Sequence, residues 1–558
     1  MNNTLTIDGC PVTVPEGSTV LDAARQLGLN IPTLCHLAGV KENRPSCMAC
    51  VVRIGNDPRL SPACSTPAAD GMVVESETPG IKAARKAALE LLFSDHLGDC
   101  VSVCQRVCPA RLQIPATIRL VAAGKMREAI ALVKENVVFP GVMGRICRAP
   151  CQAGCRRAKY DGAVAIQLIE REVANQDAAD PFVPPCGPPT GKHVAIVGAG
   201  AAGLSAAFFL MCSGHRCTVF DDHAEPGGHM RHGVPESELP RAVLEGEIEV
   251  IRRLGLELRM NTRLGRDVSL EELREQFDAV ILTPGNMQAT DPAGLGVEAT
   301  ERTIRIDATT YQTSVPGVFA AGSAIRSGYD PARSVGDGRT LAECADGFLN
   351  GRIHRAGRKD FTSTIPKMPL EEYQELSKGS VATLSVRELI TEAETAAGRC
   401  CHCDCRAANN CRLRLFAQEY EVDPKAYSGG HRRKFEFIRQ PAGVIFEPGK
   451  CISCGICVEL AADAPLGLTF IGRGFDLKIG VPLDGSLADG LQKAAEACVK
   501  HCPTGALAFE DEAKNMQEVA CALREAMEDA EDLPDVMAVL NNPGKPVPMA
   551  EIRKKYGL

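Results

Sequence analysis

Most cysteines of this chain fall in short groups, and grouped thiols are the residues most able to do chemistry here. The sequence has 26 cysteines among 558 residues. Closely spaced thiolates bind iron–sulfur clusters or zinc. The groups are Cys35, Cys47, Cys50 and Cys64; Cys100, Cys104 and Cys108; Cys147, Cys151 and Cys155; Cys400, Cys401, Cys403, Cys405 and Cys411; and Cys451, Cys454, Cys457, Cys498 and Cys502.

Composition narrows the class of protein. Net charge is -8 and the sequence pI is about 5.9, with no long basic run, which argues against a nucleic-acid or anionic-membrane partner. The first residues lack a basic segment followed by an apolar one, and no apolar run approaches the ~20 residues that span a bilayer. We therefore expect a cytoplasmic protein without a membrane span, in which a disulfide framework is not expected.

The first group has the spacing C-x11-C-x2-C-x13-C and follows a hairpin signal at Asp8-Gly9 and a helical stretch that ends at Gly28. Its text, IPTLCH, SCMACVV and PACSTPAADGMVVES, resembles the N-terminal ferredoxin domain of the iron–sulfur subunit of respiratory complex I and of NAD-linked hydrogenases. The resemblance implies one [2Fe–2S] cluster on Cys35, Cys47, Cys50 and Cys64. Zinc is the alternative, because four thiolates also suit it.

The second and third groups share a spacing of four residues. His96, Cys100, Cys104 and Cys108 recur at this period, which predicts one face of a helix, and Cys147, Cys151 and Cys155 repeat it. These are seven ligands, one fewer than two four-iron clusters need. Two helical segments are predicted between Ile114 and Asn136.

This block is similar to the N-terminal region of the glutamate synthase small subunit and of dihydropyrimidine dehydrogenase, through LQIPATIRLVAAGKMREAIALV, GRIC and AVAIQLIERE. The resemblance implies two [4Fe–4S] clusters, one on His96, Cys100, Cys104 and Cys155 and one on Cys108, Cys147, Cys151 and Glu170. That family usually has cysteine where His96 stands, although SDHLGDC also resembles a histidine-ligated cluster of the complex I subunit. The alternatives are a surface histidine and a solvated helix charge at Glu170.

Residues 193–221 predict a dinucleotide site. Gly198, Gly200 and Gly203 form G-x-G-x-x-G between an apolar strand and a helix, and Asp221 ends the next strand. The glycines allow pyrophosphate close to the helix N-terminus, and the acid accepts from ribose hydroxyls.

Two further segments extend the resemblance to FAD-binding members of the glutamate synthase family. Gly227 and Gly228 follow Pro226, and VPGVFAAGSAIRSG contains Gly322 and Ser323. In that family an aspartate occupies the position of Ser323, so flavin binding could be weaker or differently poised here. An empty, degenerate flavin fold is the alternative.

The family's nicotinamide-binding domain has no counterpart here. Only 29 residues, 286–314, separate Gly285 from Val315, where that family inserts a whole domain. This length cannot hold a ~100-residue domain. A second G-x-G-x-x-G is absent from the sequence. We therefore expect electrons to enter or leave through the clusters and a partner subunit.

The C-terminal cysteines predict one or two more sites. In CCHCDCRAANNC, a tetrathiolate of Cys400, Cys403, Cys405 and Cys411 would suit zinc or a [4Fe–4S] cluster, and Cys401 could replace Cys400. Cys451, Cys454 and Cys457 have the two-residue spacing of ferredoxins, and Cys502 precedes a proline as in their closing ligand. Cys498 is predicted to be a buried apolar thiol. The surrounding text resembles the linker between cluster motifs of complex I and hydrogenase subunits.

The sequence therefore predicts a multidomain α/β and α+β chain with a β-grasp-type ferredoxin, a helical bis-cluster domain, a Rossmann-like FAD domain and a ferredoxin-like C-terminal domain. The expected ranges are 1–95, 96–185, 190–358, a cysteine-rich segment at 385–440, 441–515 and a helical tail at 516–558. The expected cofactors are FAD, one [2Fe–2S], three [4Fe–4S] clusters and a fourth cluster or zinc at Cys400–Cys411. No catalytic residue is predicted.

The expected function is an electron-transfer subunit of a soluble multisubunit oxidoreductase. Its partners would resemble NADH-oxidising flavoprotein subunits or ferredoxin, and its flavin would either bifurcate or store electrons. Three alternatives stay open: an electron adaptor for a molybdenum, tungsten or other reductase, a self-sufficient NAD(P)H reductase, and a flavin-free redox scaffold.

Overall fold

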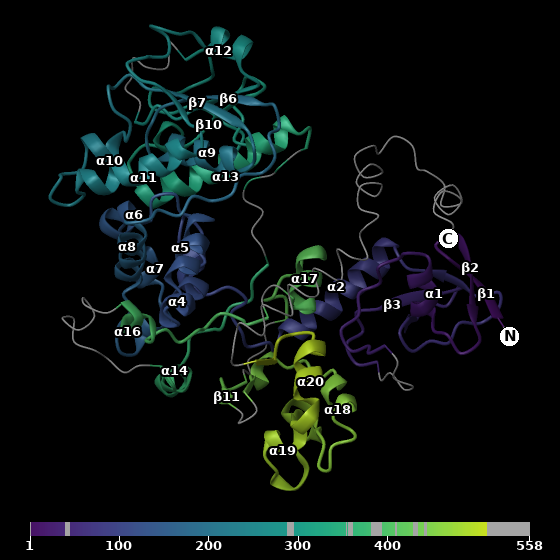
Figure 1. Cartoon of the computed structure of the whole chain (residues 1–558). Helices are drawn as coiled ribbons and strands as arrows, with labels where there is room; N and C mark the ends of the chain where they lie inside the picture. The colour runs from purple at the N-terminus through teal and green to yellow at the C-terminus, as the bar shows by residue number, and fades with distance from the viewer. Residues whose placement is uncertain are drawn as a thin grey trace. The chain divides into compact units, whose positions relative to one another are not determined.

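A computed structural model describes the chain as two compact units (Figure 1). Unit 1 joins residues 1–98 to the chain from residue 405 onward, and unit 2 is residues 99–404. The described residues are 2–38, 45–286, 295–352, 354, 356, 361–380, 393–407, 410–427, 433–439 and 443–509. The predicted tail at 516–558 lies outside them.

The N-terminal part of unit 1 is a mixed five-stranded sheet, in the order β2-β1-β5-β3-β4, with the buried face of helix α1 against it. The predicted hairpin is confirmed: β1 pairs antiparallel with β2 through Asp8 and Gly9, which both have positive φ angles. Thr19 caps α1, as a capping box with Asp22. The elements are β1 (Asn2–Ile7), β2 (Cys10–Pro15), α1 (Val20–Gln26), β3 (Val51–Ile54), β4 (Leu60–Pro62), β5 (Val73–Glu75) and α2 (Pro79–Phe93).

Helix α2 connects the two halves of unit 1 because it packs against α17 (Arg412–Glu419) as well as β3. Arg85 lies at the centre of this contact with its side chain fully buried. Its guanidinium donates to the Val51 carbonyl at 3.1 Å, to Glu77 at 3.2 Å and to the Tyr420 hydroxyl at 3.2 Å. One side chain therefore ties the N-terminal sheet to a segment more than three hundred residues later.

We expect Arg85→Met to lower the free energy of unfolding of unit 1 by about 2–4 kcal/mol, because it leaves the buried Val51 carbonyl without its donor. Urea titration followed by the visible absorption of the N-terminal cluster measures this change. Arg59→Met is the matched control, since the Arg59–Asp57 pair lies on the surface and should leave the midpoint unchanged. Equal midpoints for the two variants would contradict the prediction.

The C-terminal part of unit 1 builds a small core from a three-stranded sheet, β11-β12-β15, a two-stranded sheet, β13-β14, and helices α18 and α20. Its elements are β11 (Ile438–Arg439), β12 (Val444–Phe446), η4 (Pro448–Lys450), α18 (Ile456–Leu460), β13 (Thr469–Ile471), η5 (Gly474–Asp476), β14 (Lys478–Gly480), η6 (Pro482–Asp484), α19 (Leu487–Leu491), η7 (Gln492–Ala494), α20 (Ala495–His501) and β15 (Leu507–Phe509).

Unit 2 begins with a helical part that includes the two segments predicted between Ile114 and Asn136, which are α4 and α5. The prediction that residues 96–108 share one helical face is wrong. Only α3 (Val103–Val107) is helical there, because Ser102 caps it and Pro109 follows it. The other helices are α4 (Ile114–Ala122), α5 (Met126–Lys134), α6 (Pro140–Ile146), α7 (Pro150–Ala153), η1 (Arg156–Lys159), α8 (Ile166–Asp177), α14 (Leu370–Ser377) and α16 (Ala393–Ala397).

The rest of unit 2 is a parallel five-stranded sheet in the order β10-β9-β6-β7-β8. Figure 1 shows α9 and α13 along one side of this sheet and α12 on the other. Alternate residues of β6 enter different cores: Ile196 packs with α9, and Ala195 with α12. The elements are β6 (His193–Val197), α9 (Ala201–Cys212), β7 (Arg216–Phe220), α10 (His229–His232), α11 (Arg241–Arg253), β8 (Glu257–Arg259), α12 (Leu270–Gln276), β9 (Ala279–Leu282), β10 (Val318–Ala320), η3 (Gly322–Ala324) and α13 (Pro331–Leu349).

Strands β9 and β10 are hydrogen-bonded neighbours, with Val280 opposite Val318. The segment between them is the one whose length is too short for an inserted domain. The fold class predicted from the sequence, a multidomain mixture with ferredoxin-type parts and a Rossmann-like part, is confirmed. Among the helices described, none combines the length and the apolar character needed to cross a bilayer.

Candidate functional site

The four cysteines of the first group lie together in the N-terminal sheet domain, all of them buried. The sulfurs of Cys35 and Cys47 are 3.4 Å apart, and the Ser46 amide donates to Cys35 at 3.4 Å. A hydrogen bond from Cys64 lowers the pKa of Cys50 to about 7. Cys64 contacts both Cys50 and Cys35, so the four thiols form one continuous group that suits a cluster with four thiolate ligands.

The C-terminal group forms a second set in unit 1. Cys451, Cys454, Cys457 and Cys502 line one cavity between α18, α20 and β12. The Ser453 amide donates to the Cys451 sulfur at 3.4 Å. Burial raises the pKa of Cys451 to about 11 and that of Cys454 to about 12, so as free thiols they would be protonated.

The expected role of Cys498 is confirmed. Its side chain is 1% exposed within the core of this domain, and its sulfur contacts the Cys457 carbonyl at 3.8 Å. The charge of Cys35 also contributes to raising the pKa of Cys454. The two thiol sets of unit 1 are therefore close enough to interact electrostatically.

A third set lies in unit 2 and includes a carboxylate. Burial and the charges of Glu170 and Cys108 raise the pKa of Cys147 to about 11, and the same neighbours raise the pKa of Cys151. Glu170 is only 9% exposed on α8. Burial, and then the charge of Glu247, raises its pKa to about 8. The structure thus brings together Cys108, Cys147, Cys151 and Glu170, and the alternative of a solvated charge at Glu170 is wrong.

His96 is partly buried in unit 1 and its Nδ1 atom is shielded from solvent, which argues against the alternative of a surface histidine. Burial, followed by the charges of Lys450 and Arg433, lowers its pKa to about 3, which keeps the imidazole neutral and able to bind a metal. Its Nδ1 atom has no hydrogen-bond partner among the described residues.

The three cysteines predicted with His96 lie in unit 2. The Cys100 sulfur contacts the Ser363 hydroxyl at 3.2 Å. Cys104 is instead close to Cys155, and the charge of Cys155 contributes to raising the pKa of Cys104.

The predicted tetrathiolate at Cys400–Cys411 is divided between the units. Cys400 and Cys403 belong to unit 2, and Cys405 and Cys411 to unit 1. Cys411 caps α17 by accepting from the Arg414 amide at 3.4 Å. Burial raises the pKa of both Cys400 and Cys403, and the charge of Cys104 raises both further.

The spacing of ligand atoms bears on the choice between zinc and clusters. A tetrahedral zinc ion with Zn–S bonds of about 2.3 Å would hold its sulfurs about 3.8 Å apart. Within the described residues, the one trio of ligand atoms that all lie within 4.8 Å of one another is Asp221, Asp222 and His223. No three thiols within the described residues lie that close together, which favours polynuclear clusters over single zinc ions. The Asp221 trio is a surface group at the edge of the dinucleotide site.

The glycine-rich loop joins β6 to α9. Gly198 has a φ angle of +106°, and a Cβ there would lie 2.1 Å from the Thr283 carbonyl oxygen. A Cβ at Gly203 would lie 2.0 Å from the Gly198 carbonyl oxygen. At Gly200 the nearest atom to an added Cβ is 4.0 Å away, so space remains before the uncapped N-terminus of α9. This is the arrangement that admits a pyrophosphate.

The residues around the loop fix its position. The Asp221 carboxylate accepts from the Ala199 amide at 2.6 Å, and the Gly227 amide donates to the Ala199 carbonyl at 2.8 Å. Gly228 has a φ angle of +51° and its Cβ would lie 2.8 Å from the Gly200 Cα atom. Asp221 thus holds the loop at the end of β7, where ribose hydroxyls would be expected.

The second predicted nucleotide segment closes the same site. A Cβ at Gly322 would lie 2.9 Å from the Ala202 side chain, so this turn packs directly on α9. The Ser323 hydroxyl donates to the Gly328 carbonyl at 3.0 Å. Tyr329 has a buried hydroxyl without a partner among the described residues, and its ring lies 4.0 Å from that of His229. A buried hydroxyl without a partner in the described part of the chain, packed against the α10 residue that follows Gly228, fits a bound dinucleotide.

Three segments of the chain match known domain families. Residues 2–79 match a 2Fe-2S iron-sulfur cluster binding domain. Residues 97–181 match the 4Fe-4S cluster domain II of dihydropyrimidine dehydrogenase, and residues 196–246 match an NAD(P)-binding Rossmann-like domain. Three separate segments of the chain are therefore similar to two kinds of iron–sulfur domain and one dinucleotide-binding domain. The matches agree with the ferredoxin and glutamate synthase resemblances of the sequence.

Curated relatives share about a third of the chain. The NADPH-Fe(3+) oxidoreductase subunit beta of Geobacter sulfurreducens is 37% identical over 36% of this chain and 30% of its own length. The NADP(+)-dependent formate dehydrogenase subunit beta of Moorella thermoacetica is 36% identical over 35% and 31%. The glutamate synthase [NADPH] small chain of Bacillus subtilis is 38% identical over 33% and 38%. The chain thus spans about a third of the length of the relatives it matches.

Likeness to solved structures is confined to smaller parts. An NAD+-reducing [NiFe]-hydrogenase in the H2-reduced state is 35% identical over 17% of this chain and 39% of that chain, with a TM-score of 0.16. FprA from Mycobacterium tuberculosis in complex with NADPH is 23% identical over 18% and 24%, with a TM-score of 0.17.

Proposed function

We propose that this chain is an FAD- and iron–sulfur-containing electron-transfer subunit that exchanges electrons with partner subunits of a larger oxidoreductase. The observation that carries the proposal is the gathering of thiols into separate sets in both units, together with one dinucleotide fold. When bound, FAD would accept electrons in pairs and release them singly. The proposed cofactors are one FAD, one [2Fe–2S] cluster and several [4Fe–4S] clusters.

The residues of the chain have distinct roles in this proposal. Gly198, Gly200 and Gly203 give the pyrophosphate access to the N-terminus of α9, whose amides and dipole stabilise its negative charge. Asp221 is placed to accept from ribose hydroxyls while it holds the loop. The buried thiols would bind iron as thiolates, and the surrounding amides, such as that of Ser453, stabilise the negative sulfur.

The proposal of partner subunits is based on the short connection between β9 and β10. The short segment there leaves no room for a nicotinamide-binding domain of the usual kind. The relatives include subunits of NADPH- and NADP(+)-dependent complexes. We therefore propose that pyridine nucleotide is oxidised or reduced on another subunit and that electrons reach this chain through its clusters.

We expect the anaerobically purified chain to contain about one FAD and to keep its flavin absorption when NADPH or NADH is added, because it lacks a site for nicotinamide beside the flavin. Dithionite should bleach the same flavin and show that it is reducible. Absorption at flavin wavelengths in a stopped-flow instrument measures both. The co-purified subunits are identified by mass spectrometry.

Each alternative function has its own signature in this experiment. Rapid bleaching by either nucleotide with the chain alone would identify a self-sufficient reductase. Flavin near zero with a full iron content would identify a flavin-free scaffold. A co-purified subunit containing molybdenum or tungsten would identify an electron adaptor. Rapid bleaching by a nucleotide, or flavin near zero, would each contradict the proposal.

A further inference from the structure

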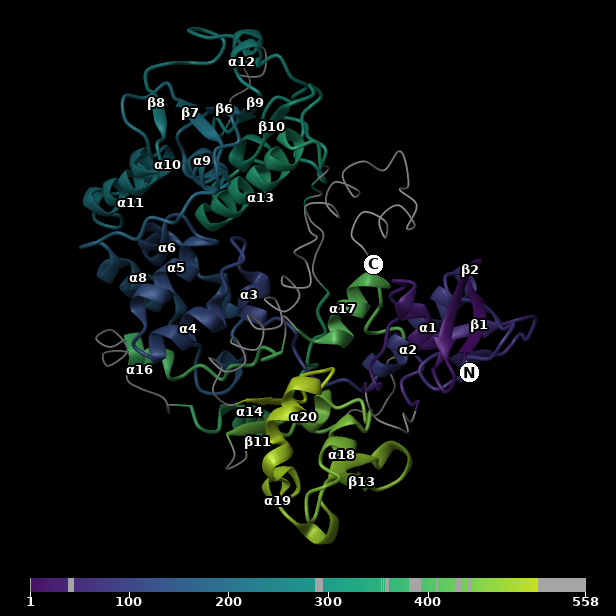
Figure 2. The same cartoon turned by 45° about the vertical axis from the view of Figure 1, so that its right-hand side comes forward.

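The segment from Arg399 to Asp404 is held against the helical part of unit 2 largely by polar contacts. Its sequence is RCCHCD, which contains no aliphatic residue. The preceding helix, α16, packs against α4 and α8, as both the contacts and Figure 2 show. Within the segment, Cys400 packs against the hydrophobic core of unit 2, and buried arginine and aspartate contacts hold both ends.

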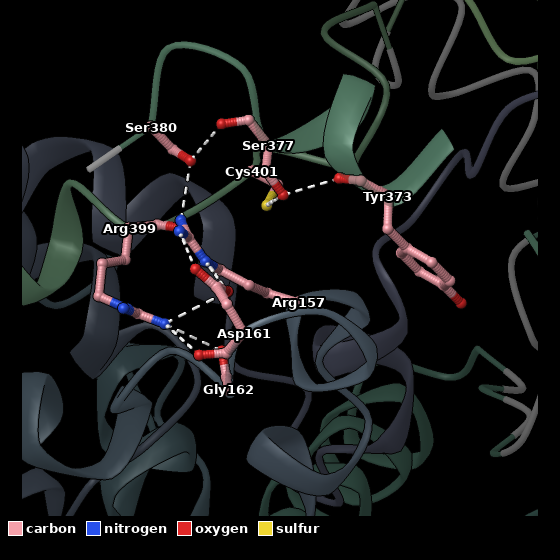
Figure 3. Close-up of polar contacts among 8 residues, drawn as sticks. All are labelled: Arg157, Asp161, Gly162, Tyr373, Ser377, Ser380, Arg399 and Cys401. Carbon is pink, nitrogen blue, oxygen red and sulfur yellow. Dashed lines mark hydrogen bonds and ion pairs between the residues drawn. The ribbon is translucent and has the colours of Figure 1, made fainter. Parts of the chain in front are cut away.

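Arginine contacts fix the first end of the segment (Figure 3). Arg157, directly after Cys155 and Arg156, donates to the Arg399 carbonyl and forms a two-point ion pair with Asp161, with both contacts at 2.6 Å. Arg399 in turn donates to the Asp161 and Gly162 carbonyls at 3.2 and 3.1 Å. Both guanidinium groups are almost fully buried, with 2% of each side chain exposed.

A second pair of charges fixes the other end. Asp404 forms a parallel backbone bridge with Asp99. Its carboxylate accepts two hydrogen bonds from Arg119 of α4, at 3.1 and 3.0 Å. Asp99, with none of its side chain exposed, pairs with Arg156 at 2.7 Å and accepts from the Ile365 amide at 2.9 Å. Buried ion pairs of this kind are costly to desolvate. Their presence indicates that the position of the segment relative to the helical part is important.

Between these two ends the thiols of the segment meet those of the helical part. Cys104 on α3 is 8% exposed and belongs to the hydrophobic core of unit 2, and both Cys155 and Cys400 pack against that core. Cys104 is also an electrostatic neighbour of Cys155, Cys400 and Cys403. Cys401 lies beside the Ser377 hydroxyl, with 3.5 Å between sulfur and oxygen, and its electrostatic neighbour among the thiols of the helical part is Cys155 (Figure 3).

We propose that Cys104, Cys155, Cys400 and Cys403 bind one [4Fe–4S] cluster, so that two thiolates come from the helical domain and two from a segment about 250 residues later. This ligand set replaces the one that pairs Cys104 and Cys155 with His96 and Cys100. Each thiol releases a proton as it binds iron. No three of these sulfurs all lie within 4.8 Å of one another, which favours a cubane over a single zinc ion. The inference rests only on the iron–sulfur part of the proposed function.

Iron analysis of the full chain, purified anaerobically, tests the site. We expect Cys400→Ala and Cys403→Ala each to lose about four iron and four sulfide per chain relative to the wild type. Cys401→Ala tests the neighbouring thiol, which is close to Cys155 and is the alternative to Cys400, and this variant should keep the wild-type content. The electron paramagnetic resonance spectrum of the dithionite-reduced protein should lose one and the same [4Fe–4S] signal in the first two variants only.

Three results would overturn the inference. The first is full iron in Cys403→Ala, the second is loss of one zinc in place of iron, and the third is iron loss in Cys401→Ala with full iron in Cys400→Ala.

Cys403→Ser guards against misfolding, because serine can still bind iron. A shifted paramagnetic resonance signal from one cluster in this variant supports the site, and an unshifted spectrum contradicts it. If the proposed electron-transfer function were wrong, the wild-type chain itself would lack iron or flavin, which distinguishes that result from failure of this one site.

Discussion

Gly198→Ala should remove the flavin from this chain while leaving its clusters in place. The added Cβ would lie 2.1 Å from the Thr283 carbonyl oxygen, and the φ angle of +106° is one that alanine adopts only with strain. The loop that faces the pyrophosphate would have to move away from β9. We expect flavin affinity to fall at least about tenfold, equivalent to about 1.4 kcal/mol, and the purified variant to be nearly colourless in the flavin bands.

Gly246→Ala is the matched control for this variant. Gly246 is exposed on α11, and an added Cβ there would meet no atom within 4 Å. Alanine favours a helix over glycine by about 1 kcal/mol, so this variant should be as stable as the wild type and retain its flavin. Flavin is quantified after acid release, and iron in the same samples reports on the rest of the fold. Wild-type flavin content in Gly198→Ala would contradict the proposed site.

Cys50→Ala should eliminate the [2Fe–2S] cluster and destabilise the N-terminal sheet domain. Cys50 and Cys64 are each 1% exposed within the hydrophobic core of that domain, so the cluster they would bind forms part of the core itself. Metal binding of this kind contributes directly to folding. We expect a loss of about two iron and two sulfide per chain, with loss of the corresponding visible circular dichroism.

Cys10→Ala provides the comparison, because Cys10 is exposed at the start of β2. The cluster content and the thermal unfolding of the Cys10→Ala variant should match those of the wild type. If Cys50→Ala kept a full [2Fe–2S] spectrum, the assignment of Cys50 as a ligand would be wrong. If it instead lost a single zinc ion, the domain would be a zinc site.

Local spacing predicted much of the fold and the cysteine group of the C-terminal domain, whereas the set of Cys108, Cys147, Cys151 and Glu170 was implied by a family resemblance. The Asp8-Gly9 hairpin, the glycine loop before α9 and the C-terminal ferredoxin spacing each depend on residues close in sequence, whose geometry is set by turns and caps. The period of four at His96–Cys108 led to a wrong prediction of one long helix, because it too considered only residues close in sequence. Periodicity alone does not make a helix when Ser102 and Pro109 confine it to five residues.

Other features depend on packing that spacing does not encode. The meeting of Cys104 with Cys400 joins residues about 300 apart, and the arginine contacts that produce it have no local signature. Glu170 did have a signal: α8 buries Ile166, Ile169, Glu170, Val173 and Asp177. These positions follow the helical repeat of a buried stripe, so the carboxylate could have been placed inside from the sequence.

The discontinuity of unit 1 has a consequence for how the protein is made. Helix α2 leaves the ribosome long before α17, since residues 99–404 (404 − 98 = 306 residues) must be translated in between. At ~5–20 residues per second this delay is about 15–60 s. During it, the face of α2 that carries Arg85 has no α17 to cover it. The nascent chain therefore exposes this face of α2 until α17 has been synthesised.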